Sequence, residues 1–228
     1  MLDHVRDLES LHTATERLLT AAARLDNGSV AGPSRLPGWS RGHVLAHLAR
    51  NADALVNVLE GRPMYPDTAT REAEIVRDAP RTPAAQVADV RATAEHFRRV
   101  AAVPADWART VALRNGVTDI AARVPFRRLV EVWIHHVDLD IGLELEDLPD
   151  DFTGREIDFL TERFAGHPDV PPLALSTPDG RGWRTGRADG TAVPVTGPAA
   201  DLMGWLAGRR DGSALRTALS PLPVLPAL

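Results

Sequence analysis

The chain has 228 residues, of which 44% are hydrophobic and 25% charged, and this length allows one large domain or two small ones. Its net charge of −5 argues against a nucleic-acid partner, because nucleic-acid-binding surfaces are usually strongly basic. No apolar run approaches the roughly 18 residues that a membrane span needs, and the charged N-terminal residues lack the apolar core of a signal peptide. We therefore expect a cytoplasmic protein that does not cross a membrane.

Two missing residue types narrow the chemistry that the chain can perform. There is no cysteine, which excludes disulfides, thiolate metal sites and a cysteine nucleophile, so any thiol must be supplied from outside. All 26 basic residues are arginine, which excludes Schiff-base catalysis by lysine. The preference for arginine over lysine is typical of a high-GC bacterial genome.

The first predicted helices begin close to the N-terminus. Apolar residues at steps of three and four predict an amphipathic helix over residues 2–25, which Asn27 and Gly28 would end. The segment 36–39 predicts a turn. Ser40 is a suitable N-cap for a second helix that runs to about Glu60.

Two further helices are predicted downstream. Residues 61–81 are polar and interrupted by prolines, which predicts a loop. Thr82 would then cap a third helix with Pro83 in its first turn, and residues 103–123 give no clear pattern. Pro125 opens a fourth helix that runs to about residue 143. Four helices in about 145 residues predict an antiparallel bundle.

The pattern changes near residue 148. A helix is predicted over 151–165, followed by short apolar runs separated by turn residues, which predict a small sheet with hairpins. Another helix is predicted over 198–208 and a final strand over 214–219. We therefore predict an α+β protein with two domains, a four-helix bundle over residues 1–147 and a small α/β domain over 148–228.

The fourth predicted helix carries a narrow polar stripe. Glu131, His135 and Asp138 follow one another at i, i+4 and i+7 on a helix that is apolar nearly all round, which predicts burial. A buried carboxylate needs a partner, because removing it from water costs several kcal/mol. A metal ion would be such a partner, although Glu131 and His135 could also form an ordinary i, i+4 pair. His136 points elsewhere and is expected at the surface.

The second predicted helix offers two more imidazoles. His47 lies beside the core face of this helix, whereas His43 lies one turn earlier near the exposed helix start. His47 is therefore the preferred ligand candidate and His43 the reserve, although a single histidine on a helix is more often a core-edge or surface residue. Two imidazoles and one carboxylate are a common way to hold zinc with coordination positions left open.

Asp138 could act at such a site without touching the ion. A carboxylate of this kind would orient His47 or a ligand water. A surface aspartate is the alternative. Nickel, manganese or iron could occupy the same donor set as zinc.

Two segments together resemble a known family. The segment LPGWSRGHVLAHLA from Leu36 to Ala49 and the segment EVWIHHVDL from Glu131 to Leu139 resemble the mycothiol-dependent maleylpyruvate isomerase family of DinB-like metalloenzymes. The resemblance implies a four-helix bundle followed by a small α/β domain. It also implies that His47, Glu131 and His135 hold zinc.

The second domain carries a further part of the resemblance. The segment ADLMGWLAGR, residues 200–209, looks like the family's second domain, from which an arginine approaches the metal. Arg209 is the best match for that catalytic arginine, and Arg210 is the next.

The resemblance implies a thiol cofactor, mycothiol, and a small electrophilic substrate. We expect the chain to act as a monomer. The implied reaction is cis-trans isomerisation, in which the activated thiolate adds to a double bond and later leaves it. A mycothiol S-transferase that keeps the thioether product is the alternative. A metal-binding or small-molecule-binding module without catalysis is a third possibility.

Overall fold

A computed structural model describes residues 3–103, 105–218 and 222–226 of the chain. The chain divides into two compact units, Met1–Leu143 and Glu144–Leu228, which are described separately below. Among the described residues, no helix has the length and apolar character required to cross a membrane.

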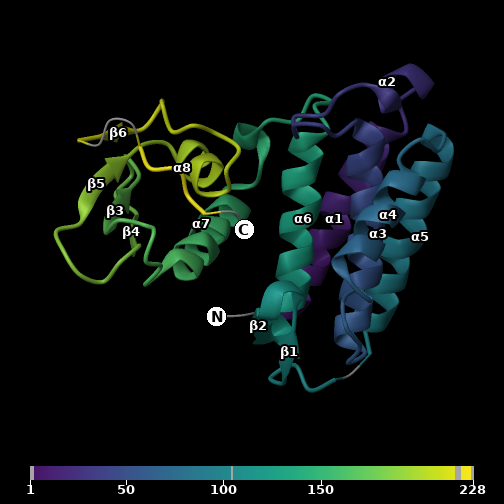
Figure 1. Cartoon of the computed structure of the whole chain (residues 1–228), viewed down its shortest axis with the longest axis horizontal. Coiled ribbons are helices and arrows are strands. Elements are labelled where there is room, and N and C mark those ends of the chain that lie inside the picture. The colour runs from purple at the N-terminus through teal and green to yellow at the C-terminus, as the bar shows by residue number, and fades with distance from the viewer. Residues whose placement is uncertain (1–2, 104, 219–221, 227–228) are drawn as a thin grey trace. The chain divides into compact units, whose positions relative to one another are not determined.

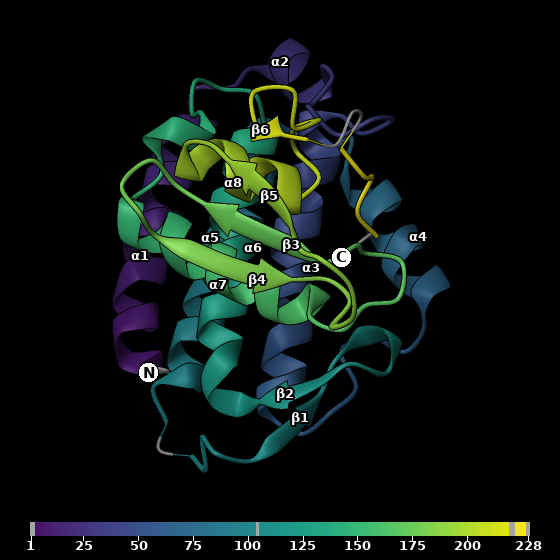
Figure 2. The ribbon, with the colours of Figure 1, turned by 90° about the vertical axis from the view of Figure 1, so that its left-hand side faces the viewer.

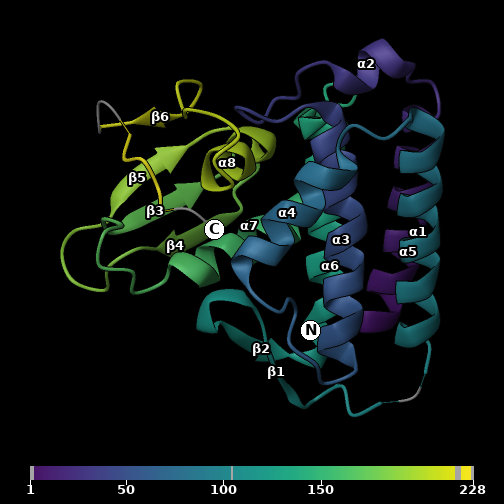
Figure 3. The same ribbon diagram turned by 45° about the vertical axis from the view of Figure 1, so that its right-hand side comes forward.

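The first unit is built on four long helices that lie side by side (Figures 1 and 3). These helices are α1 (His4–Ala22), α3 (Arg41–Leu59), α5 (Pro83–Ala101) and α6 (Val124–Asp138). Helix α1 packs against α5 and α6, and α3 packs against the same two helices. The predicted bundle is therefore confirmed, and its packing makes α3 and α6 direct neighbours although they are far apart in the sequence.

The start of α3 has the structure that the sequence predicts. Gly38 has a φ of +79°, and the Trp39 amide donates to the Leu36 carbonyl at 3.0 Å, which closes the predicted turn. The Ser40 hydroxyl accepts from the His43 amide, while the His43 ring nitrogen Nδ1 accepts from the Ser40 amide. This reciprocal capping box fixes the first turn of the helix and, with it, the direction in which later side chains point.

Two helix ends differ from the prediction. Helix α1 stops at Ala22, and the Asp26 side chain caps a separate short helix, α2 (Asn27–Ala31), so Asn27 begins a helix rather than ending one. Helix α6 stops at Asp138, well before residue 143, because Asp140 and Gly142 adopt positive φ angles of 55° and 93°. These left-handed residues turn the chain out of the helix.

The segment 61–81, predicted as a loop, contains a helix. Helix α4 (Thr68–Asp78) begins after Asp67, whose side chain accepts from the Thr70 amide. The prolines on either side predicted a loop over the whole segment, whereas the helix occupies the proline-free stretch between them. Helix α4 packs along α3 (Figure 3).

Residues 110–120, within the segment that gave no clear pattern, form a small hairpin. Strand β1 (Thr110–Ala112) pairs antiparallel with β2 (Thr118–Ile120), with Thr110 opposite Ile120. Two 3-10 turns, η1 (Arg114–Gly116) and η2 (Ala121–Arg123), connect the strands and lead into α6.

Buried polar contacts fix α4 against α3 and α5. The Gln86 side-chain amide donates to the carbonyls of Gly42 and Ala79 at 3.2 and 3.1 Å. Arg50 on α3 forms ion pairs with Asp78 at 3.3 Å and Asp89 at 3.0 Å, so one guanidinium joins all three helices. The N-terminal half of α3 therefore has a fixed position against the C-terminal end of α4.

The second unit combines a four-stranded sheet with two helices (Figure 2). The sheet order is β4-β3-β5-β6, in which β3 pairs antiparallel with β4 and parallel with β5, and β5 pairs antiparallel with β6. Helices α7 and α8 pack against each other, and α7 also packs on β4. The elements are η3 (Leu145–Asp147), α7 (Asp150–Phe164), β3 (Leu173–Ser176), β4 (Gly182–Thr185), β5 (Val193–Thr196), α8 (Ala199–Leu206) and β6 (Arg216–Thr217).

These elements confirm the small α/β arrangement that the sequence predicts for this part of the chain. The final strand is shorter than the predicted 214–219, and Leu219 lies outside the described residues.

Replacing Gly42 with alanine should destabilise the first unit. An added Cβ would lie 2.1 Å from the Ala79 carbonyl oxygen, so α3 and α4 would have to move apart. We expect the free energy of unfolding, measured with urea, to fall by about 1–3 kcal/mol. Gly28→Ala is the matched control, because an added Cβ there has only an ordinary 3.5 Å contact with Asp26 and should leave stability unchanged or slightly raised. Equal stability of both variants would contradict the tight α3–α4 contact.

Candidate functional site

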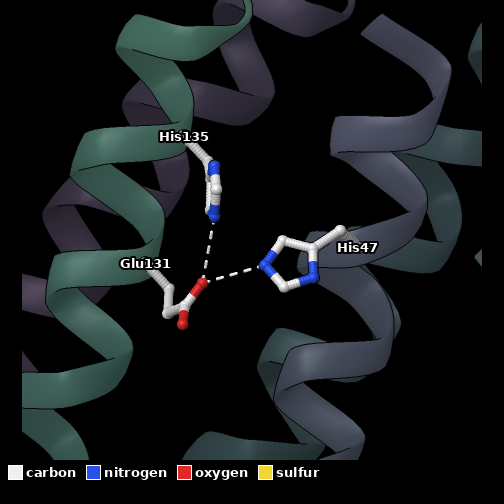
Figure 4. Close-up of side chains that lie close together, drawn as sticks. All are labelled: His47, Glu131 and His135. Atoms are coloured by element: carbon white, nitrogen blue, oxygen red, sulfur yellow. Dashed lines mark hydrogen bonds and ion pairs between the residues drawn. The ribbon is translucent and has the colours of Figure 1, made fainter. Parts of the chain in front are cut away.

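Three predicted ligand residues meet between α3 and α6 (Figure 4). Their candidate ligand atoms all lie within 4.8 Å of one another. His47 Nε2 is 2.9 Å from Glu131 Oε2, and His135 Nε2 is 3.1 Å from the same oxygen. The two imidazole rings are edge-to-face, with centroids 4.6 Å apart. The structure thus brings together residues that are 84 positions apart in the chain.

The cluster is open on one side. His47 is buried, whereas the Glu131 side chain keeps 31% of its surface exposed. Glu131 is therefore partly buried, where the sequence predicted a buried stripe. An exposed side leaves room for a ligand to reach the three donor atoms.

The three groups perturb one another's protonation. Burial lowers the pKa of His47 to about 4, so its ring is neutral at pH 7. Burial alone would raise the pKa of Glu131, but hydrogen bonds from His135 and His47 hold it well below its ordinary value. Burial alone would lower the pKa of His135, yet hydrogen bonds to Asp138 and Glu131 raise it. Without a metal ion, the cluster therefore holds an ionised Glu131 carboxylate and a neutral His47, and its contacts favour the charged form of His135.

Asp138 orients one of the imidazoles. Its Oδ2 accepts a hydrogen bond from His135 Nδ1 at 2.8 Å, and the aspartate is only 1% exposed. The sequence predicted a carboxylate of this kind, but the structure pairs it with His135 rather than with His47. This contact keeps the proton on Nδ1 and turns Nε2 toward Glu131.

Two other histidines lie outside the cluster. His43 is half-buried, and its ring nitrogen is engaged in the capping box of α3, so the structure does not place it with the ligands. His136 was expected at the surface, which is wrong, because it is 2% exposed. Its ring stacks on Trp133 at an interplanar angle of 3°, and burial lowers its pKa to about 4. Its position one residue after His135 directs it to the opposite, core-facing side of α6.

Two arginines near the cluster were missed at the sequence level. Arg71 on α4 places its Nη2 3.2 Å from His47 Nδ1. Arg128, one turn before Glu131 on α6, is 1% exposed and donates to the Asn51 side chain at 2.8 Å. The sequence predicted a loop around Arg71, so it gave no helix face on which to place this side chain. Arg128 could have been found from its place on the apolar face of α6.

The C-terminal arginines are each engaged within the second unit. Arg209 Nη1 donates to the Ala207 carbonyl at 2.9 Å. Arg210 forms ion pairs with Asp201 and with Glu146, the latter at 2.6 Å. Two carboxylates thus hold Arg210 in place. The role predicted for Arg209 stays a prediction.

The first unit also contains a cavity of about 530 Å³. Its walls are the segment that links α3 to α4, which includes Tyr65, and strand β1 with the residues that follow it. Arg109 and Arg114 lie along its wall. A volume of this size accommodates a small organic molecule.

The donor set fits a divalent metal ion. Two imidazole nitrogens and one carboxylate oxygen converge, and His135 has the outer carboxylate contact that ligating histidines usually make. Three protein donors with an open side are typical of catalytic rather than structural zinc sites. Fold and site together define a four-helix-bundle protein with a candidate open metal centre.

Comparisons with known proteins place this chain in a family. The family model of the mycothiol maleylpyruvate isomerase N-terminal domain matches residues 11–140, and that of the MDMPI C-terminal domain matches residues 147–227. The chain belongs to the mycothiol-dependent maleylpyruvate isomerase family, which confirms the resemblance seen in its sequence. No curated protein sequence matches the chain.

Two solved structures are similar to the whole chain. One is a mycothiol-dependent maleylpyruvate isomerase, and the other is a mutant of that enzyme in which a histidine is replaced by alanine. Both have a TM-score of 0.88 and cover 100% of this chain and 98% of theirs, at 24% and 23% sequence identity. They confirm the predicted α+β fold.

Asp138→Asn should weaken metal binding at the cluster without removing a ligand. The amide can still accept from His135 but carries no charge, so the imidazole becomes a poorer donor, and zinc affinity should fall about tenfold. Competition with a chromophoric chelator measures this. Asp140→Asn is the control, because Asp140 pairs with Arg35 and Arg41 outside the cluster. A similar loss of zinc affinity in both variants would argue against a specific role for Asp138.

Proposed function

We propose that the protein is a metal-dependent and mycothiol-dependent cis-trans isomerase of the maleylpyruvate isomerase type. The observation that carries the proposal is the convergence of His47, Glu131 and His135 in a chain without cysteine. The family and the two similar enzymes support the reaction class. Zinc is the proposed metal, since two imidazoles and a carboxylate suit it well.

The roles of the protein residues follow from their contacts. His47 and His135 would each offer Nε2, and Glu131 would offer Oε2, because these are the atoms that face one another. Asp138 would keep His135 in the tautomer that leaves Nε2 free to bind. The metal, when bound, would supply a Lewis acid that lowers the pKa of a thiol placed at the open side.

The proposed reaction moves one thiolate on and off the substrate. A free thiol has a pKa of about 8.5 and is mostly protonated at neutral pH, so activation matters. The thiolate sulfur forms a bond to one carbon of the cis double bond, and the electron pair moves toward the adjacent carbonyl. The remaining single bond rotates, the electron pair re-forms the double bond in the trans arrangement, and the sulfur leaves. No atom is gained or lost overall.

The substrate of this reaction type carries carboxylates, which an arginine can bind through two parallel hydrogen bonds. We propose Arg209 for this role, with Arg210 as the alternative. Arg209 is the better match to the family's segment, and the Arg210 guanidinium is held by Asp201 and Glu146.

The proposed partners are therefore small molecules only, a thiol cofactor and an electrophilic substrate. We further propose a cytoplasmic, actinobacterial monomer, because mycothiol is the thiol of many actinobacteria. The arginine-rich, lysine-free composition supports a high-GC source.

His47→Ala should abolish stoichiometric metal binding. The change removes one of three donors, and Glu131 and His135 alone would hold the ion only weakly. Metal content after dialysis, measured by elemental analysis, should fall from about one per chain to near zero. His43→Ala is the matched control on the same helix, because it removes a capping contact but no ligand. Full metal content in His47→Ala would show that the ligand assignment is wrong.

The activity itself is tested by mixing zinc-loaded protein, mycothiol and maleylpyruvate and following absorbance with mass analysis. The proposal predicts isomerisation that needs both metal and thiol, with a product of unchanged mass. A stable thioether would instead identify an S-transferase. If neither product forms, the protein binds metal without catalysing either reaction.

A further inference from the structure

Arg71 has a position that the proposed reaction leaves unexplained. Its guanidinium is half-buried beside the metal-ligand cluster, with Nη2 3.2 Å from His47 Nδ1. Its Cζ lies 5.8 Å from the centroid of the Tyr65 ring. Across residues 3–103, 105–218 and 222–226, no carboxylate forms an ion pair with Arg71.

Two other shielded arginines of this unit have acidic partners, whereas the buried Arg128 donates to the Asn51 side chain. Arg50 pairs with Asp78 and Asp89, and Arg127 pairs with Asp119 at 2.6 Å. A partly buried cation without an anion is costly, because it loses hydration without gaining a counter-charge. The position of Arg71 therefore favours an anion that the chain itself does not supply.

The contact between Arg71 and His47 cannot persist when a metal is bound. A guanidinium only donates hydrogen bonds, so His47 Nδ1 must accept, and the ring proton lies on Nε2 facing Glu131. A metal ion needs the lone pair of Nε2, which moves the ring proton to Nδ1. Two donors would then face each other, and Arg71 has to turn away from His47.

His135 shows the opposite arrangement. Its Nδ1 faces the Asp138 carboxylate, so this ring can keep its Nδ1 proton and its outer contact when Nε2 binds a metal in place of the Glu131 contact. On the His47 side, by contrast, the outer contact itself must change. Arg71 is the group that changes.

We propose that Arg71, together with the Tyr65 hydroxyl, forms a carboxylate-binding site beside the metal ligands. This inference rests on the metal site of the proposed function. Metal binding releases the guanidinium from His47, and a carboxylate of the substrate then binds it through two parallel hydrogen bonds. A bound divalent ion would add positive charge beside the Arg71 guanidinium, which favours an anionic ligand there.

Space for such a ligand lies next to this pair. Tyr65 contacts Arg71 and also lines the cavity of about 530 Å³. Arg109 and Arg114 on the cavity wall add positive charge on the same side. A small acid held by Arg71 would therefore have room to extend past Tyr65.

The test uses succinate as a probe, because it carries two carboxylates and no double bond for a thiol to attack. Calorimetric titration of the zinc-loaded protein should show binding, and Arg71→Met should weaken it about 10- to 100-fold, the loss expected for charged hydrogen bonds. Arg71→Lys should recover only part, since it keeps the charge without the planar fork. Arg77→Met is the control, because Arg77 lies on the same helix but is exposed and pairs with Asp78.

Zinc affinity gives a readout independent of activity. Arg71→Met should bind zinc at least as tightly as the wild type, because it removes a cation and a competing contact at His47. A merely structural Arg71 would instead lose zinc and succinate binding together. Nitrogen-15 NMR of the histidine rings should show the His47 proton moving from Nε2 to Nδ1 when zinc is added.

The outcomes distinguish failure of the carboxylate site from failure of the proposed function. Unchanged succinate binding in zinc-loaded Arg71→Met, or no succinate binding in the wild type, would overturn the carboxylate site alone. Failure of the wild-type chain to bind zinc would overturn the proposed function, and this inference would fall with it.

Discussion

The structure depends on one shared oxygen, Glu131 Oε2, on which the imidazoles of His47 and His135 converge from two helices. A carboxylate and two imidazoles taken largely out of water are costly unless each charge is matched. The bundle meets this condition only because α3 and α6 are neighbours, which the packing of both against α1 and α5 enforces. Capping at Ser40 and the tight Gly42 contact then fix the part of α3 that carries His47.

Much of this arrangement could be predicted from local sequence signals. The serine and proline caps located the starts of α3 and α5. Helical periodicity preferred His47 to His43 and placed Glu131, His135 and Asp138 on one stripe, and the structure brings His47, Glu131 and His135 together. Features that depend on contacts between distant segments could not be predicted. The partner of Asp138 and the burial of His136 are set by packing around α6. Helix α4 lies between prolines, which predicted a loop over its whole segment.

The same limitation explains why Arg71 was missed. No local sequence pattern distinguishes Arg71 from the other arginines. Its proposed role follows from its contact with Nδ1 of His47. The cluster is therefore asymmetric. On the His135 side, Asp138 prepares the imidazole to bind a metal, whereas on the His47 side a cation occupies the position where a hydrogen-bond acceptor would be expected. That asymmetry links metal binding to the availability of a guanidinium for an acidic ligand.

The central claim is that a site built without cysteine activates a thiol supplied from outside. Proton release tests it most directly, because a thiol with a pKa of about 8.5 carries its proton at pH 7 unless the site removes it. Adding mycothiol to zinc-loaded protein in weak buffer with a pH indicator should release about one proton per bound thiol, with the metal-free protein as the blank. Binding of mycothiol to the zinc-loaded protein without any proton release would contradict the account.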